Sequence, residues 1–125
     1  MKPVLVDSDI LIEVSRGRDE QVADRWLALS GSLGGVLFSP VTVAEIWCGA
    51  RPREHPSIES LFSSVICVPI GEEIGRRAGE YLAIYSKSHN LELGDALIAA
   101  TAASHSALLW TRNRKHYPMK DLEFY

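Results

Sequence analysis

The chain lacks the extremes of composition that mark membrane-embedded, disulfide-rich or nucleic-acid-coating proteins. It has only two cysteines in 125 residues, Cys48 and Cys67. Their spacing fits neither a metal site nor a redox pair, and their neighbours are apolar, so we interpret both as small core fillers. No hydrophobic run approaches the length of a membrane span, and no basic region, apolar core and cleavage site precede the first predicted strand. We therefore expect a cytoplasmic protein with no membrane partner.

Excess positive charge is absent as well, since 16 acidic residues outnumber 13 lysines and arginines and give a net charge of −3. A chain with this balance does not coat nucleic acid through a general positive field, although it can still bind phosphates through metal ions. Its basic residues form short clusters that we interpret as solvated surface. The clusters are Arg16 and Arg18, Arg51 and Arg53, Arg76 and Arg77, and Arg112, Arg114 and Lys115.

Short apolar runs alternate with helical patterns along residues 1–125, with no repeat, low-complexity tract or linker between them. The runs predict strands at 4–6, 36–38, 65–68 and 108–110. The periodic stretches predict helices from residue 9 towards Gly17, after Asp19, at 43–50, 58–62 and 72–87, and from 95 to 103. This alternation predicts a single α/β domain, in which helices cover both faces of a central parallel sheet.

The first predicted strand runs directly into Asp7, Ser8 and Asp9. A carboxylate in this position lies at the carboxyl end of a parallel strand, where open α/β sheets keep their ligand sites. Asp7 can also cap the following helix, and Ser8 and Asp9 can do so as well. Asp7 is therefore the strongest single candidate for a functional residue, and Asp9 is a weaker one.

Two more acids begin predicted helices. Glu45 falls in the first turn of the helix at 43–50, where Thr42 and Glu45 also have the spacing of a capping box. Asp95 opens a helix that is apolar nearly all round, so its charge needs a partner or water unless it acts as a cap. We expect Asp7, Glu45 and Asp95 to converge at one edge of the sheet. Clustered carboxylates repel one another unless a cation lies among them, and oxygen ligands favour Mg²⁺ or Mn²⁺.

Four segments, in order and over almost the whole chain, resemble those of PIN-domain ribonucleases of the VapC toxin type. They span residues 4–12, 39–50, 94–102 and 108–117. The resemblance implies a PIN-like three-layer α/β/α fold with a central parallel sheet of four or five strands. It also implies that Asp7, Glu45 and Asp95 are metal-binding catalytic acids. Asp9, Thr111 and Asn113 match positions at the rim of that site.

The last segment departs from many relatives, which carry a fourth acid near the position of Asn113 or His116. This chain has no Asp or Glu there, so a second metal ion would have fewer ligands. We expect His116 to contact a substrate phosphate or to be plain surface, rather than to be a main metal ligand.

The function that the resemblance implies is a Mg²⁺- or Mn²⁺-dependent endoribonuclease, with tRNA or another structured RNA as substrate. It also implies a VapB-like antitoxin as partner and a homodimer. Gly75 and Gly79, spaced for close helix approach, agree with a neighbouring chain. Two alternatives are a haloacid-dehalogenase-like phosphatase with Asp7 as nucleophile, and a PIN-like module that binds RNA or protein without cutting.

Overall fold

The structure is a computed structural model that describes residues 2–31 and 35–125. The strands in these residues are β1 (Val4–Val6), β2 (Val36–Phe38), β3 (Ile66–Cys67), β4 (Leu108–Trp110) and β5 (Glu123–Phe124). The α-helices are α1 (Ser8–Arg16), α2 (Glu20–Ser30), α3 (Pro40–Gly49), α4 (His55–Ser63), α5 (Glu72–Tyr85) and α6 (Leu93–Ser104). The same residues also form the 3₁₀ turns η1 (Pro52–Glu54) and η2 (Arg114–His116).

All strand pairs are parallel, and the order in the sheet is β3-β2-β1-β4-β5. The chain therefore moves outward from β1 on one side through β2 and β3, and then continues on the other side with β4 and β5. This reversal makes the carboxyl ends of β1 and β4 the topological switch point, where open α/β sheets form their binding crevice. The predicted parallel sheet is confirmed, and β5 is an added short edge strand.

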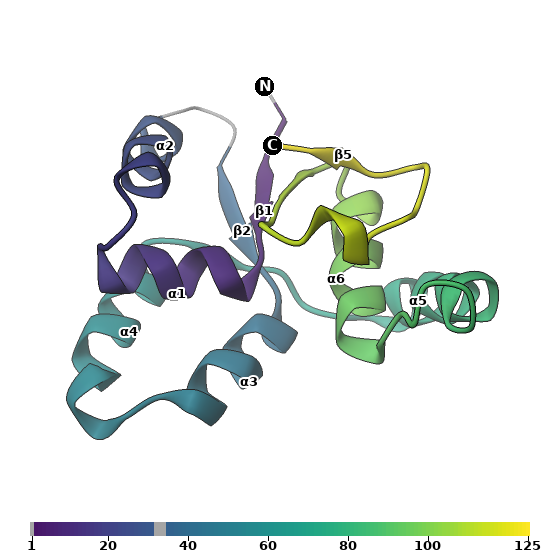
Figure 1. The fold of residues 1–125 in the computed structure, drawn as a ribbon, viewed down its shortest axis with the longest axis horizontal. Helices are drawn as coiled ribbons and strands as arrows, with labels where there is room; N and C mark the ends of the chain where they lie inside the picture. Colours follow the sequence, from purple (N-terminus) through teal and green to yellow (C-terminus); the bar gives the residue numbers. More distant parts are fainter. Residues whose placement is uncertain (1, 32–34) are drawn as a thin grey trace.

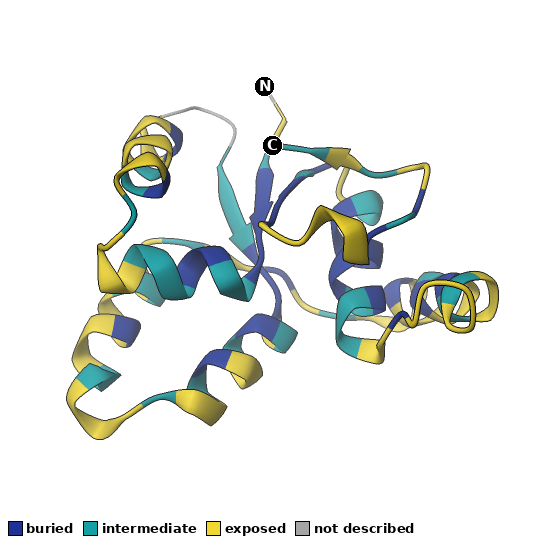
Figure 2. Cartoon of the chain, in the orientation of Figure 1, coloured by how far each residue is buried: buried dark blue, intermediate teal, exposed yellow. Residues whose placement is uncertain are grey.

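Helices cover both faces of the sheet, so the molecule has three layers (Figure 1). Helices α1 to α4 pack on the face that holds Val4 and Val6, and α5 and α6 pack on the opposite face around Leu5. Successive residues of β1 thus enter different cores, and each is at most 2% exposed (Figure 2). A strand that is buried on both faces has to be apolar throughout, which is why β1 reads as an unbroken hydrophobic run.

Some helices start earlier than predicted, because the residue that caps the helix lies before the first residue of the apolar stripe. Helix α3 begins at Pro40, and the Ser39 side chain accepts a hydrogen bond from the Val41 amide at 3.1 Å. Proline at the first position suits a helix start, because its missing N–H would have no partner there. The capping-box alternative for Thr42 and Glu45 does not hold. The prediction that Glu45 lies in the first turn is wrong, because α3 starts at Pro40 and Glu45 lies in its middle.

Other helix ends shift in the same way. Asp7 caps α1, in place of Ser8 or Asp9, whereas Asp19 caps α2 as predicted. Gly17 ends α1 with a φ of 66°, a left-handed conformation that glycine adopts without strain. Helix α4 starts at His55, before the predicted residue 58, and α6 starts at Leu93. The turn-rich break expected at 31–35 lies partly outside the described residues.

Both cysteines are exposed, so the prediction that Cys48 and Cys67 fill the core is wrong. Cys48 lies on the outer side of α3, and Cys67 lies in β3, the short strand at the edge of the sheet. Apolar neighbours in the sequence therefore did not predict burial, because the helix or strand that carries each cysteine has a side that faces solvent. None of the helices in the described ranges is long and apolar enough to cross a membrane.

Leu109 lies at the centre of β4 and is fully buried. We expect Leu109→Ala to lower the free energy of unfolding by about 2–5 kcal/mol, because the change removes buried methyl groups and leaves a cavity. The control is Leu27→Ala, since Leu27 in α2 is 69% exposed, and it should cost less than about 0.5 kcal/mol. Urea unfolding of the two variants measures the difference, and equal losses would contradict this account of the core.

Candidate active site

Asp7 directly follows β1 at the switch point of the sheet, and the residue is only 6% exposed. Its backbone N–H continues the sheet by donating to the Trp110 carbonyl at 3.0 Å. Its carboxylate accepts hydrogen bonds from the Ser8 amide at 2.8 Å, the Thr111 hydroxyl at 3.0 Å and the Tyr117 hydroxyl at 2.8 Å. These donors stabilise a buried charge that has no ion pair within the described part of the chain.

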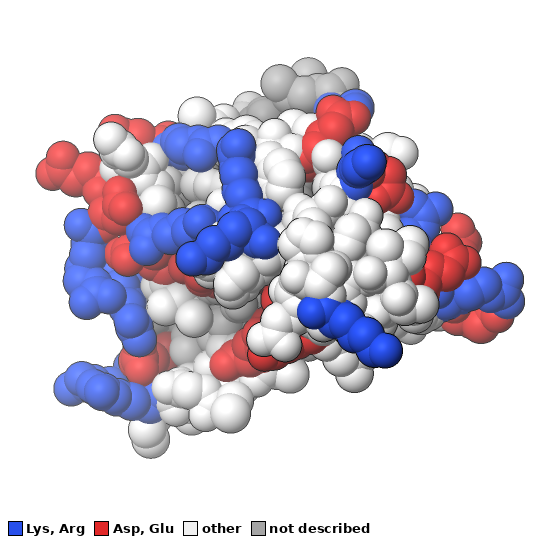
Figure 3. All heavy atoms as spheres, turned by 45° about the vertical axis from the view of Figure 1, so that its right-hand side comes forward, with Lys and Arg blue, Asp and Glu red and all other residues white. Residues whose placement is uncertain are grey.

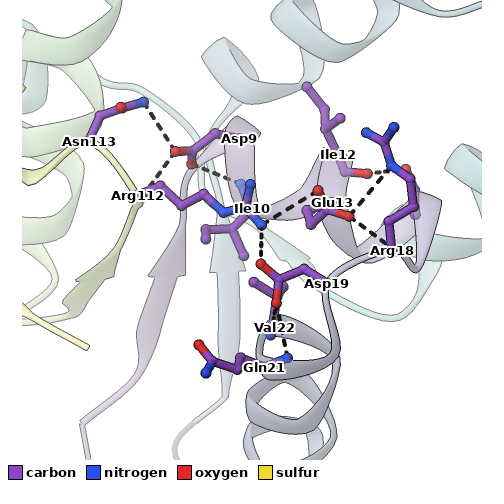
Figure 4. Close-up of polar contacts among 11 residues, drawn as sticks. Asp9, Ile10, Ile12, Glu13, Arg18, Asp19, Gln21, Val22, Arg112 and Asn113 are labelled. Atoms are coloured by element: carbon purple, nitrogen blue, oxygen red, sulfur yellow. Dashed lines mark hydrogen bonds and ion pairs between the residues drawn. The ribbon is translucent and has the colours of Figure 1, made fainter.

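Asp9 lies in the first turn of α1 and contacts the segment that follows β4 (Figure 4). One carboxylate oxygen accepts from the Ile10 amide at 2.8 Å. The other accepts from the Arg112 amide at 3.0 Å and from the Asn113 side-chain amide at 3.2 Å. Burial and the nearby charge of Asp7 raise the pKa of Asp9 above its ordinary value of 3.8. Asp9 therefore ties the start of α1 to the loop after β4.

The Arg112 side chain fixes the outer side of this junction (Figure 4). Its guanidinium lies 2.8 Å from an Asp19 carboxylate oxygen and 3.5 Å from one of Glu13. Asp19 also caps α2, so this one guanidinium links α1, the start of α2 and the loop after β4. We interpreted Arg112 as solvated surface, but half-exposed ion pairs hold its side chain against the two helices.

Glu45 projects from α3 towards the start of α1. Its carboxylate accepts a hydrogen bond from the Ser8 hydroxyl at 3.2 Å. Burial raises the pKa of Glu45, the Ser8 hydrogen bond lowers it, and the charges of Asp7, Asp95 and Asp9 raise it further. The three other acids therefore lie near enough to Glu45 to be felt electrostatically.

Asp95 lies in the first turn of α6 and meets Tyr117 and His116. The Tyr117 hydroxyl is 3.3 Å from one Asp95 oxygen, and the His116 ring nitrogen is 3.8 Å from the other. Burial and the Asp7 charge raise the pKa of Asp95, and the nearby His116 and the Tyr117 hydrogen bond partly offset the rise. Burial and the acids around Tyr117 raise the pKa of its hydroxyl far above the usual range, so it remains a proton donor.

One cavity of about 380 Å³ joins these side chains, and we call it the acidic cavity. Its walls are Asp7, Ser8, Asp9, Glu45, His89, Asn90, Leu91, Glu92, Asp95, Asn113 and His116. All the predicted site residues except Thr111 line it, and Thr111 lies behind Asp7 as one of its donors. Figure 3 shows acidic side chains recessed near the middle of the face that it draws.

Sequence reasoning missed several parts of this site. Ser8 was considered only as a cap, and no role was given to Tyr117, although it closes one of the segments that carried the resemblance. The wall from His89 to Glu92 belongs to the connection between α5 and α6, where the sequence has no recognisable motif. A buried tyrosine after a polar run was the one available signal, since a buried hydroxyl needs a partner.

The donor set of the acidic cavity suits a hard cation. Five carboxylates line it, and no lysine or arginine does so among the described residues. Oxygen-rich sites of this kind favour Mg²⁺ or Mn²⁺ over softer metals. However, within residues 2–31 and 35–125, no three His, Cys, Asp or Glu side chains are gathered closely enough to hold one ion. A bound ion would therefore have to draw the carboxylates together.

The raised pKa values of Asp9, Glu45 and Asp95 predict a pH dependence of stability without metal. A carboxyl whose pKa is higher in the folded state binds more protons there than in the unfolded state. Its contribution to the free energy of unfolding therefore falls as pH rises from its ordinary pKa through the folded one. We expect Asp95→Asn to gain stability relative to wild type between about pH 4 and pH 7.

Thermal melts in chelator across this pH range measure the gain. Asp24→Asn is the matched control, because Asp24 is exposed on α2 and does not line the cavity. If the Asp95→Asn difference is as flat with pH as that of Asp24→Asn, the acids do not repel one another as inferred.

Comparisons with known proteins agree with this geometry. The sequence pattern of the PIN domain matches residues 4–122. Ribonuclease VapC10 of Mycobacterium tuberculosis is 42% identical over 118 residues, which cover 93% of this chain and 86% of that protein.

Solved structures of VapBC proteins match the chain over nearly its whole length. The structure of VapBC-1 from nontypeable Haemophilus influenzae matches with a TM-score of 0.78 and 26% identity, over 98% of this chain and 96% of that one. VapBC2 from Rickettsia felis, bound to a promoter DNA fragment, matches with a TM-score of 0.84 over 98% and 97% of the two chains. At 16% identity, this second match supports the fold alone. The chain belongs to the PIN-domain family, and its relatives include VapC ribonucleases.

Proposed function

We propose that this protein is a cytoplasmic, divalent-metal-dependent endoribonuclease that acts as the toxin of a VapBC-type pair. The observation that carries the proposal is the acidic cavity at the switch point of a PIN-domain sheet. Four acids at or within the separate helices α1, α3 and α6 line that one cavity: Asp7, Asp9, Glu45 and Asp95. The 42% identity to Ribonuclease VapC10 supports RNA as the substrate.

In this proposal Asp7, Glu45 and Asp95 are the catalytic residues and the metal ligands. Mg²⁺ or Mn²⁺ bound there would supply Lewis acidity to the phosphate and lower the pKa of a bound water. Asp7 is held rigidly by its donors and therefore anchors the site. Glu45 is the exposed one of the three and contacts Ser8, so it is suited to accept a proton from the attacking water and pass it to solvent.

The remaining predicted residues position the site and its substrate. Thr111 donates to Asp7, and Asn113 donates to Asp9 while its own amide N–H donates to the Thr111 hydroxyl. Asn113 and His116 line the cavity and are exposed to solvent, so they are suited to contact a phosphate or a ribose that enters it. Water attacks the phosphorus in line with the departing 3′ oxygen, which takes a proton, and the products are a 5′-phosphate and a 3′-hydroxyl.

The solved relatives named for VapBC pairs support a VapB-like antitoxin as partner of this chain. The acidic cavity is suited to receive a basic side chain from such a partner, because a cation there would offset the repulsion among the acids. This electrostatic match would inhibit the enzyme by occupying the position of the metal.

We also propose a homodimer through α3, which carries Trp47, and the face of α5 that carries Gly75 and Gly79. Both glycines are exposed. Among the described residues, no heavy atom beyond their chain neighbours and the nearby backbone of α5 lies within 4 Å of a Cβ placed on either of them. Ile84 on the same helix is 64% exposed, which leaves apolar surface for a partner chain to cover. Light scattering at micromolar concentration should give twice the chain mass, whereas a monomer would contradict this arrangement.

The family assignment favours the ribonuclease over the phosphatase alternative, since that alternative requires a different fold. An RNA-cleavage assay in Mn²⁺ distinguishes the ribonuclease from a non-catalytic module that binds RNA or protein. Such a module would bind RNA without cutting it in Mn²⁺.

We expect Asp7→Asn, Glu45→Gln and Asp95→Asn each to lower RNA cleavage by about a hundredfold or more, because each removes a charge that metal and water activation require. His116→Ala should lower it less than any of these, since His116 lies 3.8 Å from Asp95 at the edge of the cavity. Cleavage of total cellular RNA in Mg²⁺ or Mn²⁺, compared with chelator, measures the order of the variants.

Circular dichroism has to show that each variant remains folded. Full activity of Glu45→Gln would remove Glu45 from the catalytic set. A His116→Ala variant as inactive as Asp7→Asn would make His116 a ligand or a proton donor.

A further inference from the structure

A second hollow, of about 490 Å³, lies beyond the far end of α1. It is lined by Ser15, Arg16, Arg18, Arg51, Arg53 and Glu54, and we call it the arginine hollow. Gly17 ends α1 and turns the chain, and η1 connects α3 to α4, so two separate basic clusters of the sequence meet here. Helix α1 contacts both α3 and α4, which fixes the two clusters relative to each other.

The positive charge of the arginine hollow is largely uncompensated. Among the described residues, Arg16, Arg51 and Arg53 form no ion pair, and Arg18 lies 4.0 Å from a Glu13 oxygen. The one carboxylate that lines the hollow, Glu54, accepts a hydrogen bond from the Arg51 backbone amide at 3.0 Å. In Figure 3 basic side chains gather along the left-hand edge, the side on which Figure 1 draws the end of α1 and α4.

A smaller hollow, of about 90 Å³, borders both the arginine hollow and the acidic cavity, and we call it the connecting hollow. It shares Ser15, Arg16 and Glu54 with the first and Glu45 with the second. Its remaining lining is small or apolar: Ile12, Ile46, Gly49, Ala50 and Ile58. The path follows α1 from Ser8 to Arg16, a length of about 12 Å at ~1.5 Å per residue, which a few nucleotides can span.

We propose that the arginine hollow binds backbone phosphates of a single-stranded RNA segment whose scissile phosphate lies in the acidic cavity. This assignment rests on the proposed function and names the part of the substrate that the enzyme holds away from the cut. Guanidinium groups bind phosphate through paired charge-assisted hydrogen bonds. The enzyme has a net charge of −3 and a cavity of carboxylates, so a local arginine cluster would supply attraction for RNA away from the proposed metal site.

The connecting hollow favours a single strand over a duplex. Its small volume and its Ile12 and Ile46 walls suit one ribose or base rather than a base pair. Single-stranded loops and ends are the RNA regions whose backbone can follow a narrow groove.

The test is binding of a short fluorescein-labelled RNA of mixed sequence without self-complementarity, measured by anisotropy in chelator. We expect the double variant Arg51→Gln/Arg53→Gln to weaken binding by about tenfold at low salt. The slope of log affinity against log salt, between about 50 and 200 mM, should fall by about 1.4, or about 0.7 for each lost phosphate contact. In Mn²⁺ the same variant should raise KM and leave kcat within about twofold, because the arginines lie away from the reacting atoms.

The matched control is Arg76→Gln/Lys120→Gln, which removes the same charge from exposed positions outside both hollows. Equal RNA affinity of the two double variants would overturn the assignment, and so would displacement of the RNA by polyglutamate at equal charge. Weaker binding of a VapB-like antitoxin with unchanged RNA binding would make the hollow a protein-docking surface instead. Wild-type protein that binds RNA in this way but never cleaves it in Mn²⁺ contradicts the proposed function alone.

Discussion

The buried carboxylate of Asp7 is the interaction on which the rest of the site depends. It stands at the end of the central strand, 6% exposed, without a cationic partner among the described residues. Hydrogen bonds from Ser8, Thr111 and Tyr117 make that burial tolerable. Burial raises the pKa of Asp9, Glu45 and Asp95, and the charge of Asp7 raises it further. Folding thus assembles a region that a cation would stabilise.

Much of this arrangement could be predicted from short-range patterns combined with one rule of topology. The unbroken run of β1 indicated burial on both faces, and the alternation of strands and helices indicated parallel pairing. Strand ends and the following helix starts of a parallel sheet meet at one edge, so acids at those positions had to approach one another. Asp7 followed this rule directly, whereas Asp95 begins α6, which follows α5 and not a strand. Glu45 reached the cavity for another reason, since it lies in the middle of α3 and not in its first turn.

The parts that could not be predicted depend on tertiary contacts or on competing local signals. Tyr117 lies far from Asp7 in the sequence, and its hydrogen bond to Asp7 exists only once β4 and β1 are paired. Thr42 and Glu45 matched a capping box, but Ser39 and Pro40 upstream form the stronger start, because Pro40 needs no amide partner. Cys67 lies in an apolar run, yet its strand is a solvent-exposed edge. Strand β5 is too short to leave a pattern.

The carboxylates of the cavity differ in how many hydrogen-bond donors they hold, because two hydroxyl groups each lie between two of them. The Tyr117 hydroxyl has one proton and lies 2.8 Å from Asp7 and 3.3 Å from Asp95, so the shorter bond to Asp7 leaves Asp95 with the weaker share. The Ser8 hydroxyl likewise has one proton, with an Asp7 oxygen at 3.4 Å and a Glu45 oxygen at 3.2 Å. Asp7 keeps its Ser8 amide and Thr111 donors in either case. Asp95 and Glu45 therefore retain lone pairs without a donor, and these are the acids that a cation entering the cavity can engage without first breaking the support of Asp7.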